Sequence, residues 1–252
     1  MSEEILLRPE GALSYLGLNR PGTLNALSQG LLASLDSVLA SLEASSPRGL
    51  LIYGEGRGFS AGADLKEMAQ ITTASQIRKY VRYSQEVLNR LAQLPFPTAA
   101  AIHGFALGGG LELALACDFR VATPESRLGL PEVGLGLIPG FGGTQRLPAL
   151  IGGSAARELI LTGTPVSGQD ALSLGLVNQV ADNPQAVAQD LLTQVTRNSP
   201  QAIALAKQAL RRREVIDLET EADLFALAFV GPDRQEGITA FMEKRLANFG
   251  GE

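Results

Sequence analysis

The chain has 252 residues, of which 45% are hydrophobic and 19% are charged, so it can bury a core and is not a disordered segment. Its formal net charge of -5 gives no overall attraction for nucleic acid or for an anionic membrane. A single cysteine, Cys117, excludes an intrachain disulfide, and a single histidine, His103, excludes a multi-histidine zinc site.

The N-terminus lacks a basic segment followed by a long apolar run, and no stretch reaches the roughly 18 apolar residues of a membrane span. We therefore expect a cytoplasmic protein without a membrane partner. The first predicted element is a strand at residues 12–18. Pro21-Gly22 then interrupts the chain before a helix with apolar residues at helical spacing from Leu27 to Leu42, for which Ser28 is the candidate N-cap.

Strands and helices alternate up to about Val180. Short apolar runs bounded by glycine or proline indicate further strands at residues 49–53, 98–102 and 119–122. Helical spacing of apolar residues indicates further helices at residues 76–94 and 111–117. This alternation is typical of an α/β fold with parallel strand pairing.

From about Pro184 onward the pattern indicates helices only, near residues 201–213 and 218–229. Asp233 and Glu236 have the spacing of a capping box for a last helix that ends near Phe249. The change in composition predicts a catalytic core at residues 1–190 and a C-terminal helical region at residues 191–252. Apolar residues of the second of these helices, including Phe225 and Phe229, are expected to be buried between subunits.

Glycine-rich loops first raise the question of a nucleotide site. No GxxxxGK[ST] string is present, and the nearest approach to GxGxxG, at residues 134–139, fails at its last position. Gly58-Phe59-Ser60-Ala61-Gly62 does match GxSxG, the nucleophile turn of serine hydrolases. The only available base, His103, lies in mid-chain, so a small serine in a tight glycine turn is favoured and the hydrolase is the second hypothesis.

Two glutamates point to acid–base chemistry. Glu112 is expected in the first turn of a helix that follows the glycines at positions 108–110, where free N–H groups stabilise an anion. Glu132 lies among apolar residues and glycines, and burial there would raise its pKa. Two carboxylates with separated pKa values suit general acid–base catalysis, but their spacing in sequence does not show that they meet.

Several strings resemble the enoyl-CoA hydratase/isomerase (crotonase) family, nearly from end to end. They are LNRP at residues 18–21, NAL at 25–27, FSAGADLKEM at 59–68, ALGGGLELA at 106–114, PEV at 131–133, IPG at 138–140, GGTQRL at 142–147, GLV at 175–177, EG at 236–237 and FMEKR at 241–245. The resemblance implies a spiral core of ββα turns, with a C-terminal helical region that builds homotrimers or homohexamers.

The resemblance also implies roles for individual residues. The backbone N–H groups of Ala63 and Gly109 would hold a thioester oxygen, and Glu112 and Glu132 would add water across a trans-2-enoyl-CoA. Relatives that only move a double bond usually keep just the second glutamate. CoA would be part of the substrate, with no metal and no separate cofactor. The residues implied to line its path are Ala61, Asp64, Leu65, Lys66 and Leu130.

One position departs from many hydratases of the family. Leu130 stands two residues before Glu132, where glutamine is frequent, and the methylglutaconyl-CoA hydratase branch also has an apolar residue there. The acyl group of the substrate is therefore left open. The alternatives are hydration of an enoyl-CoA, hydration of methylglutaconyl-CoA and isomerisation of an enoyl-CoA. The methylglutaconyl-CoA hydratase branch can bind RNA through a lysine-rich helix. Here the helix from Leu27 to Leu42 has no lysine, so we expect no nucleic-acid partner.

Overall fold

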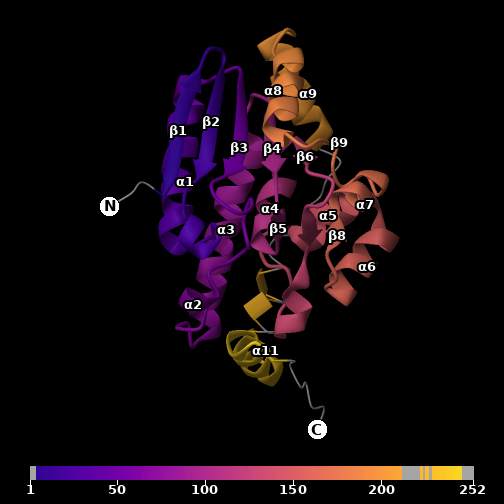
Figure 1. Ribbon diagram of the computed structural model, residues 1–252. Helices are drawn as coiled ribbons and strands as arrows, with labels where there is room; N and C mark the ends of the chain where they lie inside the picture. The colour runs from indigo at the N-terminus through magenta and orange to yellow at the C-terminus, as the bar shows by residue number, and fades with distance from the viewer. Residues whose placement is uncertain (1–3, 212–221, 224, 227–228, 246–252) are drawn as a thin grey trace.

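The computed structural model describes residues 4–211, 222–223, 225–226 and 229–245. Within this part of the chain the larger sheet has the strand order β1-β2-β3-β4-β6-β9 (Figure 1). Its strands are β1 (Ile5–Glu10), β2 (Leu13–Leu18), β3 (Gly49–Gly54), β4 (Thr98–Ile102), β6 (Phe119–Ala122) and β9 (Gln179–Val180). The β1–β2 pair is antiparallel and the other neighbours are parallel, so the predicted α/β class with parallel pairing is confirmed.

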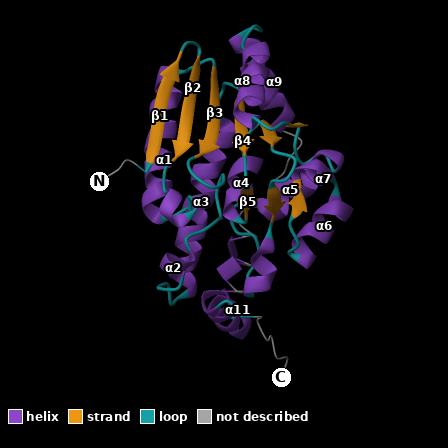
Figure 2. Cartoon of the chain, viewed as in Figure 1, coloured by secondary structure: helices purple, strands orange, loops and turns teal. Residues whose placement is uncertain are grey.

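A smaller sheet lies below the larger one in the same view and has the order β5-β7-β8 (Figure 2). Its strands are β5 (Phe105–Leu107), β7 (Arg127–Gly129) and β8 (Val166–Ser167). Along the chain, β4 is followed by β5 and then by a helix, and β6 is followed by β7 and further helices. Successive turns of the chain thus add one strand to each sheet, which is the predicted ββα spiral.

Helices cover both sheets. They are α1 (Gln29–Ser45), α2 (Leu65–Met68), α3 (Ala74–Gln93), α4 (Gly109–Leu115), α5 (Gly143–Ile151), α6 (Gly153–Thr162), α7 (Gly168–Ser173), α8 (Pro184–Val195), α9 (Pro200–Arg211) and α11 (Pro232–Glu243), with 3-10 turns η1 (Pro21–Thr23) and η2 (Pro131–Leu135). The predicted apolar stripe of α1 is buried at Leu31, Leu35 and Leu39. Each buried leucine contributes about 2 kcal/mol to stability. Ser28 caps α1 as predicted, because its side chain accepts a hydrogen bond from the Leu31 amide.

The sequence analysis missed one strand and predicted the bounds of one helix wrongly. The sequence did not indicate β1, because it is an edge strand that contains Pro9 and exposes most of its side chains. The capping box at Asp233 is also wrong, since α11 begins at Pro232 with Gly231 as its N-cap, and it ends at Glu243 rather than near Phe249. Proline at the first helical position needs no amide acceptor, which favours the earlier start.

The helical C-terminal region packs on the core within one subunit. Ala188 and Leu192 of α8 form a buried cluster with residues of the larger sheet such as Leu51, so the predicted boundary after residue 190 lies inside a helix that covers the sheet. The division into two regions stays a prediction. Most of the helix predicted at residues 218–229 lies outside the described residues, but Phe225 and Phe229 are buried in the subunit itself, against the expectation that subunit contacts bury them.

Among the described residues, no helix is long and apolar enough to cross a membrane. The same part of the chain contains no group of three or more His, Cys, Asp or Glu side chains that could hold a metal ion.

Cys117 provides a test of the core. Its side chain is buried at the C-terminal end of α4, and burial raises the pKa of the thiol to about 12. Because the thiolate is the reactive form, we expect a thiol reagent at pH 8 to label the native protein very slowly and the protein in denaturant rapidly. Labelling followed by absorbance would contradict this placement if the native and unfolded proteins reacted at similar rates.

Candidate functional site

Glu112 is anchored between two helix N-termini. It lies in the first turn of α4 and is 1% exposed. Its Oε1 accepts hydrogen bonds from the amides of Phe141, at 2.7 Å, and Gly143, at 2.8 Å. Gly142, the N-cap of α5, offers no side chain to that helix, so the Glu112 carboxylate caps α5 in its place. Both amide donors and the positive end of the helix stabilise the ionised carboxylate.

Glu132 reaches the same place from another element. It lies in η2, and the Oε2 atom of its carboxylate is buried. A Cβ atom on Gly108, the residue before α4, would lie 2.9 Å from Glu132 Oε1, so a side chain there would displace this carboxylate. Gly108 has a φ of +51°, which other residues rarely adopt. The structure therefore brings both predicted glutamates to the start of α4.

The two predicted amide donors lie on adjacent segments. A Cβ on Gly109 would lie 3.3 Å from the Ala63 nitrogen, and one on Gly62 would lie 3.3 Å from the Gly109 nitrogen. Within the described residues, neither the Ala63 nor the Gly109 amide donates a hydrogen bond. The Leu27 amide donates to the Gly62 carbonyl, and the Leu27 carbonyl accepts from the Asp64 amide. Neither bond uses the Ala63 amide. Two unengaged amides beside two carboxylates can stabilise an oxyanion during proton transfer.

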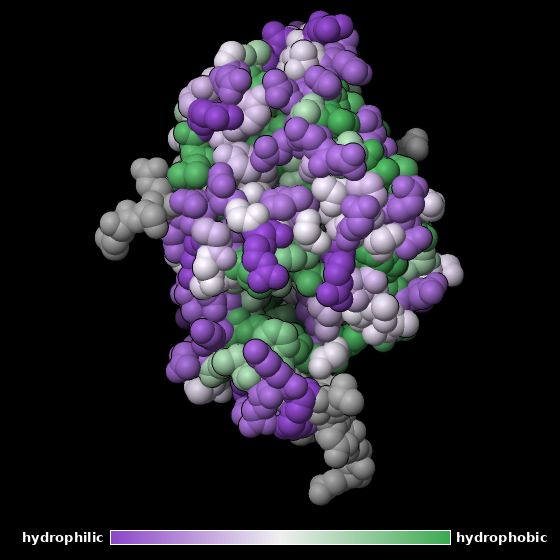
Figure 3. Space-filling view, in the orientation of Figure 1, coloured by the Kyte–Doolittle hydropathy of each residue, from purple (hydrophilic) through white to green (hydrophobic). Residues whose placement is uncertain are grey.

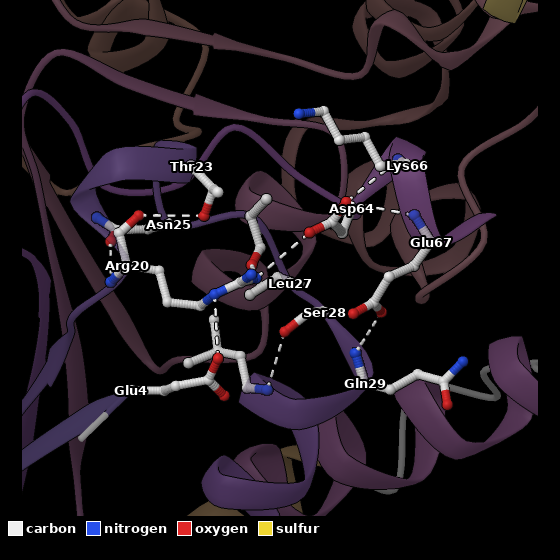
Figure 4. Close-up of polar contacts among 12 residues, drawn as sticks. Glu4, Arg20, Thr23, Asn25, Leu27, Ser28, Gln29, Asp64, Lys66 and Glu67 are labelled. Atoms are coloured by element: carbon white, nitrogen blue, oxygen red, sulfur yellow. Dashed lines mark hydrogen bonds and ion pairs between the residues drawn. The ribbon is translucent and has the colours of Figure 1, made fainter. Parts of the chain in front are cut away.

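A polar cluster fixes the loop that carries Ala63 (Figure 4). Asn25 is fully buried, and its Nδ2 donates to the carbonyl oxygens of Glu55, Gly58 and Phe59 at 2.9–3.2 Å. Arg20 donates its backbone amide to Asn25 Oδ1, at 2.8 Å, and Asn25 has a φ of +54°. These bonds hold the segment that leads into the Ser60–Ala63 loop, and the Ala61 amide and Gly62 carbonyl of that loop bond to Leu24 and Leu27.

Asp64 belongs to the same cluster. Its carboxylate accepts the amides of Lys66 and Glu67 at the start of α2 and pairs with the Arg20 guanidinium at 3.4 Å, which in turn pairs with Glu4 at 3.1 Å. Figure 4 shows these carboxylates around Arg20, while the Lys66 ammonium points away from them. Asp64 therefore has a structural role, which is to cap α2 and to pair with Arg20.

The other residues predicted along the CoA path differ in exposure. Lys66 is exposed and Leu65 packs on the core. Ala61 is half-buried, and its amide donates to the Leu24 carbonyl at 3.0 Å. Leu130 is fully buried beside Glu112, since a Cβ on Gly143 would lie 2.9 Å from Glu112 Oε1 and 3.0 Å from Leu130 Cδ1. Leu130 is thus placed at the carboxylates rather than at the surface.

The geometry of Ser60 disfavours a nucleophile. Its side chain is fully buried, the hydroxyl donates to the Asn25 carbonyl at 2.8 Å, and it accepts from the Gly62 amide at 3.3 Å. His103, the only histidine, directs Nε2 at the Gly56 carbonyl, 3.0 Å away, and not at Ser60. A serine hydrolase needs the hydroxyl bonded to its base, so this serine is structural.

Several side chains around the site were not singled out from the sequence. Gln85 and Arg146 contact the turn that holds Glu112, and Tyr80 donates to the Leu27 carbonyl at 3.1 Å and packs edge-on against Phe141. Burial raises the pKa of Tyr80 above its usual value, so its hydroxyl keeps the donated proton. Gln85 interrupts the apolar face of α3, and that interruption is the one feature of the sequence that could have pointed to these residues.

Comparisons with known proteins show which proteins this chain resembles. The Enoyl-CoA hydratase/isomerase family profile matches residues 8–252. A short-chain-enoyl-CoA hydratase from Clostridium acetobutylicum is 39% identical over 249 residues, with 96% of this chain and 95% of that protein covered. The mitochondrial methylglutaconyl-CoA hydratase of Mus musculus is 43% identical, with 94% and 79% covered. The crystal structure of an enoyl-CoA hydratase from Bacillus anthracis superposes with a TM-score of 0.81 at 39% identity, with 99% and 100% covered.

The Asn25 cluster can be tested through stability. Asn25→Ala removes one buried donor from three carbonyls, so we expect the free energy of unfolding to fall by about 2–4 kcal/mol. Thr23→Ala is the control, because the exposed Thr23 hydroxyl donates to the Arg20 carbonyl and to nothing else in the described part of the chain, and it should cost less than about 0.5 kcal/mol. Denaturant melts of both variants measure the difference, and equal stabilities would refute the anchoring role.

Proposed function

The chain belongs to the enoyl-CoA hydratase/isomerase family, and we propose that it hydrates a trans-2-enoyl-CoA thioester to a 3-hydroxyacyl-CoA. The observation that carries this proposal is the meeting of Glu112 and Glu132 at Gly108–Gly109, next to the unengaged Ala63 and Gly109 amides. Hydration needs one group to take a proton from water, one to give a proton to carbon, and donors for the charge on the thioester oxygen.

Each proposed role follows from position. The Ala63 and Gly109 amides bind the thioester oxygen and stabilise the negative charge that develops on it. Glu112, whose carboxylate is fixed by two amides, accepts a proton from water as the water oxygen bonds to C3. The electrons of the C2–C3 double bond move toward the thioester, and Glu132 delivers a proton to C2. No separate cofactor enters this scheme, and CoA leaves as part of the product.

The CoA portion would approach along the loop from Ala61 to Lys66. The exposed ammonium of Lys66 is suited to the phosphates of CoA. The Asp64 carboxylate would lie on the same path, and it caps α2 by accepting the Lys66 and Glu67 amides. A cytoplasmic location stays a prediction.

We also propose that the chain assembles as a homotrimer or homohexamer. Large apolar side chains are exposed on helices of the C-terminal half, including Leu161 at 72%, Leu210 at 72% and Phe241 at 57%. Subunit contacts would remove them from water. The burial of Phe225 and Phe229 inside the subunit removes those two from the interface that the sequence predicted.

The decisive experiment separates a hydratase from a serine hydrolase. Glu112→Gln and Glu132→Gln should each lower kcat for crotonyl-CoA hydration by at least about 10²-fold, because each removes a proton-transfer group. Ser60→Ala should keep most of the activity while it is folded, since it leaves the Ala63 amide in place. Loss of the double-bond absorbance measures hydration, and a thiol reagent follows thioester cleavage. Cleavage that depends on Ser60 and tolerates both glutamine variants would overturn the proposal.

Leu130 tests substrate choice. Its side chain lies beside Glu112 and offers no hydrogen bond to water or to a polar acyl group. Leu130→Gln should therefore change the ratios of kcat/KM among short, branched and carboxylated enoyl-CoA esters by about tenfold, with the fold retained. A panel assay of these esters gives the ratios directly. Equal ratios in the variant and the wild type would show that residues other than Leu130 determine substrate selectivity. The ester that the wild type prefers would distinguish enoyl-CoA hydration from methylglutaconyl-CoA hydration.

A further inference from the structure

Gln85 is a buried polar side chain that the proposed mechanism does not use. It lies on the inner face of α3, is 3% exposed, and is surrounded along that face by apolar residues such as Val81 and Leu88. Its Nε2 donates to the carbonyl oxygen of Gly140 at 2.9 Å. A buried amide is costly unless it is bonded, so this contact fixes where Gly140 lies.

One peptide unit connects Gln85 to Glu112. The carbonyl of Gly140 and the amide of Phe141 belong to the same planar peptide. The carbonyl end accepts from Gln85, and the N–H end donates to Glu112 Oε1 at 2.7 Å. Hydrogen bonds in such a chain polarise one another, so the Gln85 bond strengthens the donor that Glu112 receives.

The turn needs this anchor because of its composition. Three of the four residues from Gly140 to Gly143 are glycine, and Gly142 has a φ of +116°. Glycine gives the turn many alternative conformations. Arg146, 7% exposed, donates to the Phe141 carbonyl at 2.9 Å and holds the next peptide. Gln85 and Arg146 thus fix two successive peptides, one of which presents its N–H to the carboxylate.

We propose that Gln85 is a positioning residue for Glu112, which acts through the Gly140–Phe141 peptide to hold the carboxylate in its productive orientation. The inference rests on the proposed hydratase function, since it assigns Gln85 to the proton transfer made by Glu112. In this scheme Gln85 acts through the peptide and is given no direct contact with the substrate. Its removal should therefore affect turnover and leave substrate binding nearly unchanged.

The test uses Gln85→Met, which keeps the length of the side chain and removes its donor. We expect kcat for crotonyl-CoA to fall at least about tenfold with KM within about twofold, because small displacements of a catalytic group are costly. The acidic limb of the pH profile of kcat/KM should move to higher pH, since a weaker amide donor stabilises the ionised Glu112 less. If the Met variant fails to fold, Gln85→Asn, one methylene too short to reach Gly140, takes its place.

Two controls separate positioning from a general structural effect. Ser84→Ala alters the neighbouring buried residue, whose hydroxyl donates, among the described residues, only to the Tyr80 carbonyl of the same helix, and should leave kcat and the pH profile unchanged. In a Glu112→Gln background, Gln85→Met should cost no further activity, because the group it positions is gone. An equal loss in that background, or a kcat as high as that of Ser84→Ala, would overturn the inference.

A crystal structure of Gln85→Met gives a readout that does not depend on activity. We expect the distance from the Phe141 nitrogen to Glu112 Oε1 to lengthen beyond about 3.5 Å, where a hydrogen bond is lost. An unchanged distance would overturn the positioning role even if the chain hydrates enoyl-CoA. A wild-type enzyme without hydratase activity would instead refute the proposed function, and the structure would still decide whether Gln85 holds the carboxylate.

Discussion

The burial of the Glu112 carboxylate constrains the rest of the structure. A buried charge is costly unless donors replace the water that it loses, and here the donors are the amides of Phe141 and Gly143. The turn before α5 must therefore approach the side chain closely, and Gly143 has no room for a Cβ, which would lie 2.9 Å from Glu112 Oε1. The same bonds that stabilise the charge also fix the direction in which the carboxylate can accept a proton.

The smaller sheet explains why the two glutamates meet. β5 and β7 are parallel and pair Leu107 with Gly129, so both strands end at the same edge. Gly108 and Leu130 are the next residues, and the Gly108 amide donates to the Gly129 carbonyl at 2.9 Å. α4 with Glu112 and η2 with Glu132 therefore start side by side. On the other side of β5, Ser60 pairs with Ala106 and brings the Ala63 amide to the same edge.

Much of this arrangement was predictable, and the remainder depends on contacts between distant segments. Helical spacing predicted α1 and α3, the local sequence around the glycines singled out both glutamates, and the family resemblance implied the Ala63 and Gly109 donors. β1 was missed because an exposed edge strand shows no apolar pattern. The role of Asn25 depends on a left-handed backbone at a residue other than glycine. It also depends on three carbonyl groups that folding brings within reach of its side chain. A sequence shows neither feature, and it shows Gln85 only as a polar residue on an apolar helix face.

The C-terminal helical region supports the elements that carry or bind Glu112 and Glu132 as well as covering the sheet. Gly140 has no side chain because the ring of Phe225 fills that space, where a Cβ would lie 2.5 Å away. Gly237 of α11 lies against the backbone of Leu135 in η2, and in the space-filling view apolar side chains gather in the recess above α11 (Figure 3). The turn that binds Glu112 and the element that carries Glu132 are thus both backed by residues beyond position 190. Because these contacts lie within one subunit, loosening the helical region would disturb the positions of Glu112 and Glu132 directly.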